Sequence, residues 1–332
     1  STTCLVFSSP FAIWCYENLG LKCGNLFTSY SLFHDDDKNC VVKDFDLDTP
    51  LSKVDVTYAM RSHCNGIICI ASPQTILLCN PAIKECRTLP KTCLCLADDG
   101  FVRLGMGFNH DSKANDYKFV RFGYDTRLRN EMGNFVKRAE IYSMRKDAWR
   151  EIGIDLNFVG LPSRHTQFFC KGVFYWFMET CEYFIVSFNM FDEVFRSIPL
   201  PNNFHVIRKD HRTKLALWNA SVALFLCHCE RQFTDTIEVW VMDNCSSDVQ
   251  GSCSWRKTLI IGPLVDIGAP LIFLKNDEIL MKASDGSLIL YNPRTQRHTK
   301  ITSIQAANGN PHCEFSYVQS LVSVQGGSRY HS

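Results

Sequence analysis

The feature that most constrains the fold of this chain is a short pattern that recurs five times. Each copy is an apolar strand-like run, then a turn rich in Asn, Asp or Pro, and then a second strand-like run. One position of that second run serves as a marker and is occupied by Arg87, Trp149, Phe195, Trp255 and Arg297. Successive markers lie 62, 46, 60 and 42 residues apart. Spacings of this size, with four strands in each unit, are typical of propeller blades.

Hairpin signals inside the repeats support this interpretation. Asp285-Gly286 separates two apolar runs, and Asp-Gly supplies the positive φ angles that a two-residue turn needs. The same arrangement of two runs around a polar turn predicts three hairpins, at residues 67–79, 171–188 and 279–291. Helical periodicity is scarce, so the chain is predicted to be all-β.

Strand-like runs also occur at both ends of the chain, at Cys4 to Phe7, Val41 to Phe45 and Glu314 to Val324. A propeller closes its ring most simply by combining strands from both termini in one composite blade, which leaves no free sheet edge. We therefore predict a single kelch-like β-propeller domain over residues 1–325, with about six four-stranded blades. Residues 326–332 are predicted to form a flexible C-terminal tail.

The composition excludes several classes of protein. Of the 332 residues, 46% are hydrophobic and 21% are charged, and 35 Lys and Arg balance 34 Asp and Glu. A disordered chain has fewer apolar residues and a larger net charge. A general nucleic-acid binder carries a surplus of cations. A membrane-spanning helix needs about 18 consecutive apolar residues, and no such run occurs. We therefore expect neither a nucleic-acid partner nor a membrane partner.

The chain contains 17 cysteines, and several lie inside apolar runs, as do Cys69, Cys79, Cys170 and Cys227. This pattern indicates free thiols that act as small buried hydrophobic groups. The closest approaches to a zinc motif are residues 93–95 and the Cys-His-Cys triplet at 227–229. Adjacent side chains of a strand point to opposite faces, so such a triplet cannot direct three ligands at one ion. Neither a metal nor a cofactor is expected.

Motifs for catalysis are equally scarce. The chain has no G-x-S-x-G nucleophile elbow and no phosphate-binding loop, and Gly105-Met-Gly107 lacks the third glycine of a dinucleotide site. The consecutive carboxylates Asp35 to Asp37 are interpreted as solvated charge, because calcium-loop spacing is missing. Four tryptophans at blade-like intervals are predicted to pack between blades: Trp149, Trp176, Trp240 and Trp255. We predict that the chain is not an enzyme. A propeller enzyme acting on carbohydrates through paired carboxylates remains an alternative.

Several of these stretches together resemble the plant F-box-associated domain. They are residues 63–69, 79–90, 104–121, 139–152, 188–195, 237–243 and 254–264. The resemblance covers nearly the whole chain. The last of these stretches, residues 254–264, together with residues 277–286, is most similar to S-locus F-box proteins of pollen, especially the multi-gene type of the apple and pear tribe.

The resemblance implies a function. It implies a non-catalytic substrate receptor of an SCF-type ubiquitin ligase that binds non-self pistil ribonucleases (S-RNases) in the pollen tube cytosol during gametophytic self-incompatibility. Members of the family begin with an F-box that docks on the cullin adaptor. No helical stretch of that kind precedes Ser1, so we expect the F-box to be absent from this chain. The cullin adaptor and the cullin would then be partners only through that missing module. A plant F-box receptor with an unrelated protein target remains the second possibility.

The charged residues are unevenly distributed, and this suggests where a protein partner binds. Residues 35–55 hold seven acids against three lysines, whereas residues 103–150 hold eleven Lys and Arg against six acids. Patches of opposite sign can steer the encounter of two proteins. S-RNases of the implied kind tend to be basic. The candidate contact residues are therefore Asp35, Asp36, Asp37, Asp44, Asp46 and Asp48, with the basic residues Arg127, Arg129, Arg208, Lys209 and Arg212 as a second set.

Overall fold

A computed structural model describes twenty parts of the chain. They are residues 2–8, 27–35, 38–47, 60–71, 75–92, 94, 101–131, 134–156, 161–179, 183–201, 211–218, 221–230, 233–243, 253–265, 267–274, 278–283, 285, 287–301, 312–318 and 320–325. For the first three parts, and for some residues at strand ends, the description covers the backbone only. The predicted tail at 326–332 lies outside the described residues.

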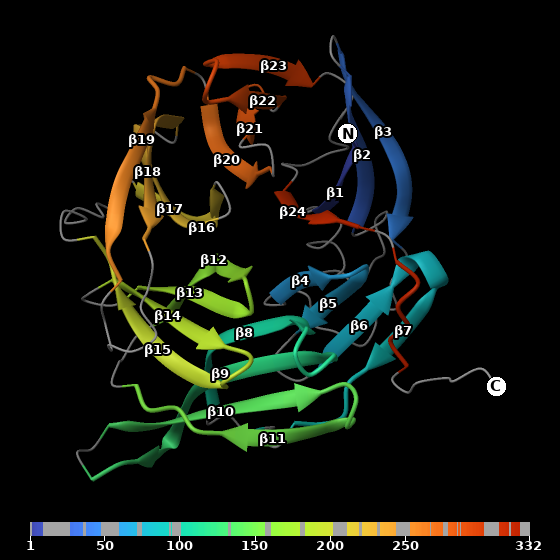
Figure 1. Cartoon of the computed structure of the whole chain (residues 1–332), viewed down its shortest axis with the longest axis vertical. Coiled ribbons are helices and arrows are strands. Elements are labelled where there is room, and N and C mark those ends of the chain that lie inside the picture. The colour runs from blue at the N-terminus through green and yellow to red at the C-terminus, as the bar shows by residue number, and fades with distance from the viewer. Residues whose placement is uncertain are drawn as a thin grey trace, which may run out of the picture.

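The described residues form six four-stranded antiparallel sheets, arranged radially around a common axis (Figure 1). Each sheet is named here by its strands. The first contains β4 (Met60–Cys64), β5 (Ile67–Ala71), β6 (Ile76–Asn80) and β7 (Glu85–Thr88), with a short 3-10 helix at Pro81–Ile83. The second contains β8 (Phe101–Asp111), β9 (Asp116–Arg129), β10 (Phe135–Ser143) and β11 (Ala148–Ile152).

The next three sheets follow in chain order. The third contains β12 (Leu161–Cys170), β13 (Val173–Glu179), β14 (Phe184–Asn189) and β15 (Val194–Pro199). The fourth contains β16 (His211–Trp218), β17 (Ser221–Glu230), β18 (Phe233–Met242) and β19 (Trp255–Ile261). The fifth contains β20 (Ile267–Phe273), β21 (Ile279–Ala283), β22 (Leu288–Asn292) and β23 (Arg297–Ile301). The three predicted hairpins lie within the first, third and fifth sheets.

The sixth sheet combines both ends of the chain, as predicted. It contains β1 (Thr2–Ser8), β2 (Phe27–Asp35), β3 (Lys38–Leu47) and β24 (His312–Tyr317). Strand β24 pairs with β1, with Val6 opposite Phe315. The six innermost strands β4, β8, β12, β16, β20 and β24 contact one another in turn and close the ring. The all-β propeller prediction is therefore confirmed.

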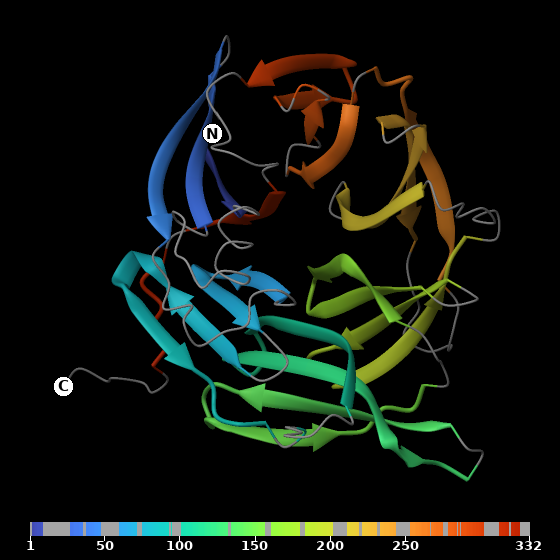
Figure 2. The ribbon, with the colours of Figure 1, turned by 180° about the vertical axis from the view of Figure 1, so that it is seen from behind.

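One predicted strand is too long. The run from Glu314 to Val324 was expected to form a single strand, but β24 ends at Tyr317. The segment Ser320–Gln325 then lies against the β4–β7 blade, and Figures 1 and 2 show it beside β7 from both sides of the molecule. Apolar alternation is the same in a strand and in any other extended segment, so the pattern could not separate the two.

The two faces of the ring differ in their connections. In the five blades that are continuous in sequence, the turns from the first to the second strand and from the third to the fourth lie on one face, called here the turn face. All seven non-glycine residues with positive φ occur in these turns: Asn65, Lys84, Asn115, Asp147, Lys171, Glu193 and Gln296. The other face, called the connection face, carries the links between blades.

The asparagines of the repeated pattern shape the third turns. The side-chain oxygen of Asn80 accepts a hydrogen bond from the Ala82 amide at 3.1 Å. Asn189 accepts from the Phe191 amide at 2.8 Å, and Asn292 accepts from the Arg294 amide at 3.0 Å. An Asn that bonds the backbone two residues on fixes a tight turn. This role explains why the pattern recurs at the same place in different blades.

The core of the molecule lies between neighbouring blades, and the tryptophans contribute to it as predicted. Trp149 donates from Nε1 to the carbonyl of Pro90 at 2.9 Å, and Trp255 donates to the carbonyl of Pro199 at 2.8 Å. Both bonds join the outer strand of one blade to the end of the blade before it. Trp176 is buried and bonds the Met106 carbonyl of the neighbouring blade at 2.9 Å. Trp240 is buried in the cluster between β12–β15 and β16–β19.

The Gly-x-Gly sequence serves this packing. A Cβ atom at Gly107 would lie 2.6 Å from the ring of Phe174 in the next blade, and one at Gly105 would lie 2.3 Å from the ring of Phe122. Both distances are too short for real contacts. Gly107 therefore allows the Phe174 ring of the neighbouring blade to approach β8, and Gly105 makes room for the Phe122 ring of its own sheet.

Some of the described cysteines are free thiols, and others form disulfides. Cys64, Cys69, Cys170 and Cys227 are buried free thiols, as expected for Cys69, Cys170 and Cys227. The prediction was wrong for Cys79, because Cys79 forms a disulfide with Cys86. The two residues are direct partners in the β6–β7 pair, a register that the apolar character of the run did not indicate. Within the described parts of the chain, no group of three or more His, Cys, Asp or Glu could hold a metal ion.

Membrane-spanning helices were also sought. No helix among the described residues has the length and apolar character needed to cross a bilayer.

Candidate functional site

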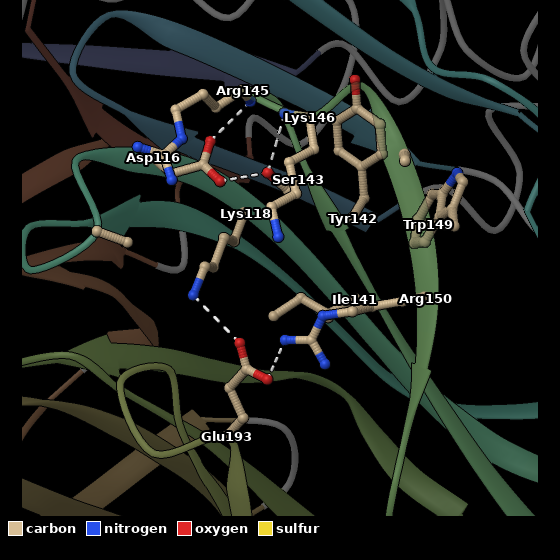
Figure 3. Close-up of a pocket in the computed structure, with 12 residues that line it drawn as sticks. Asp116, Lys118, Ile141, Tyr142, Ser143, Arg145, Lys146, Trp149, Arg150 and Glu193 are labelled. Carbon is tan, nitrogen blue, oxygen red and sulfur yellow. Dashed lines mark hydrogen bonds and ion pairs between the residues drawn. The ribbon is translucent and has the colours of Figure 1, made fainter.

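A small cavity lies on the turn face, where the outer half of the β8–β11 blade meets the β12–β15 blade. Its volume is about 230 Å³. The β8–β9 turn, the β10–β11 hairpin and the β14–β15 turn line it (Figure 3). The lining residues that carry charge are Asp116, Lys118, Arg145, Lys146, Arg150 and Glu193.

Sheet register brings these residues together. In β10, Ser143 lies opposite Lys118 of β9 on one side and opposite Ala148 of β11 on the other. Arg150 follows two residues after Ala148 and therefore points to the same face of the strand. Glu193 comes from the tight turn of the next blade and has a φ of 58°. The cavity is thus built from three separate stretches of the sequence.

A buried carboxylate fixes the hairpin turn at the edge of the cavity. Asp116 is buried and accepts a hydrogen bond from the Arg145 amide at 2.9 Å. Its second oxygen accepts from the Ser143 hydroxyl, and that hydroxyl accepts from the Lys146 amide at 3.1 Å. These bonds hold the backbone of Arg145 and Lys146 at the rim, where both residues are exposed. The charge of Asp116 is therefore used within the turn.

Two of the four cations are paired. Lys118 Nζ lies 2.6 Å from Asp111 Oδ2 and 3.3 Å from Glu193 Oε1, and Arg150 also pairs with Glu193. Burial raises the pKa of Asp111, but Lys118 and two amide hydrogen bonds outweigh it, so that pKa lies below its usual value. The side chains of Arg145 and Lys146 form no ion pair with any other described residue. The lining thus has four cations and two carboxylates.

The ion pair at this cavity repeats one between the previous two blades. Arg87 of β7 pairs with Asp147 in the turn of the β8–β11 blade, as Arg150 of β11 pairs with Glu193 in the turn of the β12–β15 blade. Asp147 has a φ of 50° and occupies the same turn position as Glu193. Each arginine therefore links its own blade to the next one on the turn face.

The chemistry of the cavity favours binding over catalysis. Both carboxylates are engaged, one with backbone amides and one with Lys118 and Arg150. The Ser143 hydroxyl lies beside the Asp116 carboxylate, but both groups are bonded within the turn, to the Lys146 and Arg145 amides. Exposed Lys and Arg side chains are donors that suit carboxylates and other anions. The arrangement can therefore hold an anionic group.

Three of the six predicted acidic contact residues are described, and they are spread along two strands. Asp35 lies at the β2–β3 turn, opposite Lys38, whereas Asp46 pairs with Thr28 near the other end of the same two strands. Eight residues of strand separate Lys38 from Asp46, which corresponds to about 26 Å. Asp44 lies between them in β3. Asp36, Asp37 and Asp48 lie outside the described residues.

The predicted basic contact residues lie elsewhere. Arg127 and Arg129 are in the hairpin of β9 and β10, which extends past the last residue paired with β8 (Figure 1). Arg127 pairs with Asp125 at 2.9 Å, and Arg129 lies over the Phe135 ring at 4.0 Å. The Arg127 side chain lowers the pKa of Asp125 to about 2. The backbone of Arg212 lies in β16, and Arg208 and Lys209 are outside the described residues.

The cationic residues of the cavity were missed, although the sequence held a signal for them. Lys118, Arg145, Lys146 and Arg150 all belong to the basic stretch 103–150. The prediction selected Arg127 and Arg129 from the same stretch. Strand order places that hairpin loop on the connection face and the cavity on the turn face. The sequence alone does not show that Arg127 and Arg129 lie on a different face from the cations of the cavity.

Comparison with known proteins agrees with the architecture. The sequence model of the F-box associated beta propeller domain matches residues 23–324. The chain belongs to this family. An F-box/LRR-repeat/kelch-repeat protein of Arabidopsis thaliana is 24% identical over 230 residues, which cover 65% of this chain and 59% of that protein. An F-box protein of the same plant is 22% identical over 296 residues, which cover 79% of this chain and 71% of that protein.

The matches differ in how much of each protein they cover. The chain spans about half the length of several relatives that it matches, with values of 59%, 45% and 53%. Among solved structures, a fungal alcohol oxidase with bound copper covers 91% of this chain and 64% of its own at 10% identity. Its TM-score is 0.47, which is too low to transfer that enzyme's chemistry to this chain.

Proposed function

We propose that this propeller is the non-catalytic substrate-recognition part of an SCF-type ubiquitin ligase. Membership of the F-box-associated propeller family carries the proposal. The scaffold suits it, because packed blades hold the described turns of the turn face in fixed positions, and rigidly held loops favour recognition. An F-box elsewhere in the protein would supply the contact with the cullin adaptor and the cullin.

In this proposal the chain accelerates ubiquitin transfer without forming or breaking a bond itself. The propeller binds a protein target, and the F-box tethers the complex to the ligase. Lysines of the target then lie at high effective concentration near the ubiquitin-charged conjugating enzyme. The rate gain depends on the affinity of the propeller for the target and on the geometry of the tether.

The finer proposal concerns the target. We propose that the target is a non-self S-RNase in the cytosol of the pollen tube. The similarity of residues 254–264 and 277–286 to pollen S-locus F-box proteins supports this choice. A basic ribonuclease would contact the acidic residues of β2 and β3, with Asp35 to Asp37 as the first candidates.

Calorimetric titration of the purified chain with a panel of S-RNases tests this proposal. We expect binding to some members of the panel, and we expect Lys at Asp35, Asp36 and Asp37 to weaken it at low salt. The control variant places Lys at three other exposed acids, Glu131, Asp155 and Asp192, and should bind as the unmodified chain does. Equal binding by both variants across a salt series would refute the acidic contact.

A different result would redirect the target assignment. If no S-RNase binds, while the chain captures another plant protein and promotes its ubiquitination when joined to an F-box, the receptor function stands with an unrelated target. If no target is ubiquitinated under those conditions, the receptor function itself fails.

A further inference from the structure

The C-terminal segment shows how a blade of this propeller holds an extended peptide. Residues Ser320–Gln325 lie beside β7 on the turn face of the β4–β7 blade (Figure 2). Val324 has no exposed surface and belongs to the core cluster between this blade and the β8–β11 blade. Residues 318–325 carry no charged side chain. We call residues 320–325 the strap.

Three side chains of the outer strands hold the strap. Asn80 donates from Nδ2 to the carbonyls of Ser320 at 3.0 Å and Val322 at 2.8 Å. The Glu85 carboxylate accepts from the Val324 amide at 3.0 Å. Arg87 donates to the carbonyl of Gln325 at 3.0 Å. The contacts are mostly to the backbone of the strap, as in other modes of extended-peptide recognition.

The cavity on the next blade occupies the equivalent position. Asn80 pairs with Glu85 across β6 and β7 as Ser143 pairs with Ala148 across β10 and β11. Two residues further, Arg87 corresponds to Arg150. On the inner side, Ser143 pairs with Lys118. The β5–β6 register pairs Ile68 with Cys79, and extending it by one residue sets Ile67 beside Asn80. The residues that contact the strap thus correspond to residues that line the cavity.

Exposure differs between the two positions. The Arg87 side chain is 15% exposed beneath the strap, whereas the Arg150 side chain is 51% exposed. Both arginines form the same ion pair to the next blade. The lower exposure of Arg87 therefore matches the cover that the strap provides, and Arg150 lacks such cover among the described residues.

The chemistry of the residues that contact the strap also differs from that of the residues that line the cavity. Glu85 is replaced by Ala148, which removes a carboxylate, and Ile67 is replaced by Lys118, which adds an ammonium group. Arg145 and Lys146 add two exposed cations at the rim. The cavity would therefore favour a peptide with acidic side chains over an uncharged one such as the strap. The chain's own residues 326–332 contain Arg329 and no acid, so charge disfavours them as the occupant.

We propose that the cavity on the β8–β11 blade binds an extended acidic peptide segment of a partner protein, in the way that the β4–β7 blade binds the strap. The backbone of the segment lies along β11, where Arg150 donates to its carbonyls, because the Ser143 hydroxyl already donates to Asp116. Its acidic side chains face Lys118, Arg145 and Lys146. The inference deepens the proposed receptor function and rests on it for the identity of the partner as a ligase target.

Fluorescence polarisation with labelled octapeptides tests the proposal on the full chain. The first probe has the sequence of residues 318–325, and the second carries Glu in place of Val322 and Val324, whose side chains pack in the core cluster between the two blades. A third carries Lys at both places. We expect the Glu peptide to bind at least tenfold more tightly than the other two. Raising the salt concentration should weaken its binding, because exposed charges are screened.

A pair of matched variants locates the site. Lys146→Glu reverses an exposed cation of the cavity and should weaken binding of the Glu peptide about tenfold. Lys84→Glu reverses an exposed lysine on the turn of the strap-covered blade and should leave binding unchanged. Equal thermal midpoints for both variants would show that the fold is intact.

The proposal is overturned if the three peptides bind equally, if none binds, or if Lys146→Glu binds as the unmodified chain does. These outcomes are separate from failure of the receptor function, because peptide binding needs no ligase component. Tight binding of the Glu peptide by a chain that promotes no ubiquitination would leave the site in place and refute the ligase role.

Discussion

The strap offers the sharpest test of how the ring is held together. We predict that Val324→Ala destabilises the protein and that Leu321→Ala does not. The two residues lie three positions apart in the same segment. Val324 has no exposed surface, whereas Leu321 is 84% exposed. Because the segment is shared, the comparison isolates burial between the β4–β7 and β8–β11 blades.

The magnitude follows from the buried surface. Val324→Ala removes two carbon groups, which contribute about 1.6 kcal/mol at about 0.8 kcal/mol for each buried group. Incomplete relaxation around the space left behind raises the loss to about 2–3 kcal/mol. Truncation of an exposed side chain such as Leu321 changes the free energy of unfolding by less than about 0.5 kcal/mol.

Equilibrium urea unfolding, followed by tryptophan fluorescence, measures both changes from the shift of the midpoint at constant slope. Trp149 packs against the cluster that contains Val324, so its emission reports on this interface. Similar midpoints for Val324→Ala and the unmodified chain would refute the assignment of Val324 to the core. Equal destabilisation by the two variants would show that burial is not the cause.

Three further predictions concern other parts of the core. Arg121→Met leaves the buried Glu140 carboxylate without the guanidinium that lies 2.5 Å from it. We expect urea unfolding to show that the free energy of unfolding falls by about 3–5 kcal/mol, and that adding Glu140→Leu to the same chain partly restores it. An unchanged free energy of unfolding in the single variant would contradict this. Gly107→Ala forces a Cβ against the Phe174 ring and should cost about 1–3 kcal/mol, whereas Gly153→Ala meets nothing within 4 Å and serves as the control in the same assay. Burial lowers the pKa of His63 to about 4, so between about pH 6.5 and 4 the unfolded chain binds a proton that the folded chain does not. Stability should therefore fall as the pH falls through that window, and His63→Gln should flatten the slope; an unchanged slope would refute the assignment.

Much of the fold was predictable because its signals are local. Asp285-Gly286 fixes a hairpin by its own turn chemistry, and the asparagines at 80 and 292 mark third turns because their side chains bond nearby amides. The recurring marker residues, from Arg87 to Arg297, all lie in the outermost strand of their blades. Repetition converts several weak local signals into one strong prediction of architecture.

Other features depend on partners that are distant in the sequence. The Cys79–Cys86 disulfide depends on the register of β6 and β7, which places the two residues opposite each other. The end of β24 at Tyr317 is decided by Asn80, Glu85 and Arg87, more than 200 residues away. An extended segment has the same residue pattern in a strand and in the strap. Only the side chains that contact the segment decide which of the two it forms.

The cavity could be predicted in composition but not in position. Four of its cations come from one basic stretch, yet Glu193 comes from the next blade and Lys118 meets Ser143 through strand pairing. The equivalence of Arg87 and Arg150 is visible only when the two blades are superposed by register. Asp35 and Asp46 are close in sequence, yet the length of β3 places them near opposite ends of the β2–β3 pair.

Ubiquitin transfer in a reconstituted reaction tests the central claim most directly. The chain is joined to an F-box, combined with the cullin adaptor, cullin and conjugating enzyme, and supplied with a non-self S-RNase. We predict ubiquitin on lysines of the ribonuclease only when the propeller is present, with the propeller itself causing no change to the ribonuclease when the ligase is omitted. Equal ubiquitination with and without the propeller would contradict the account.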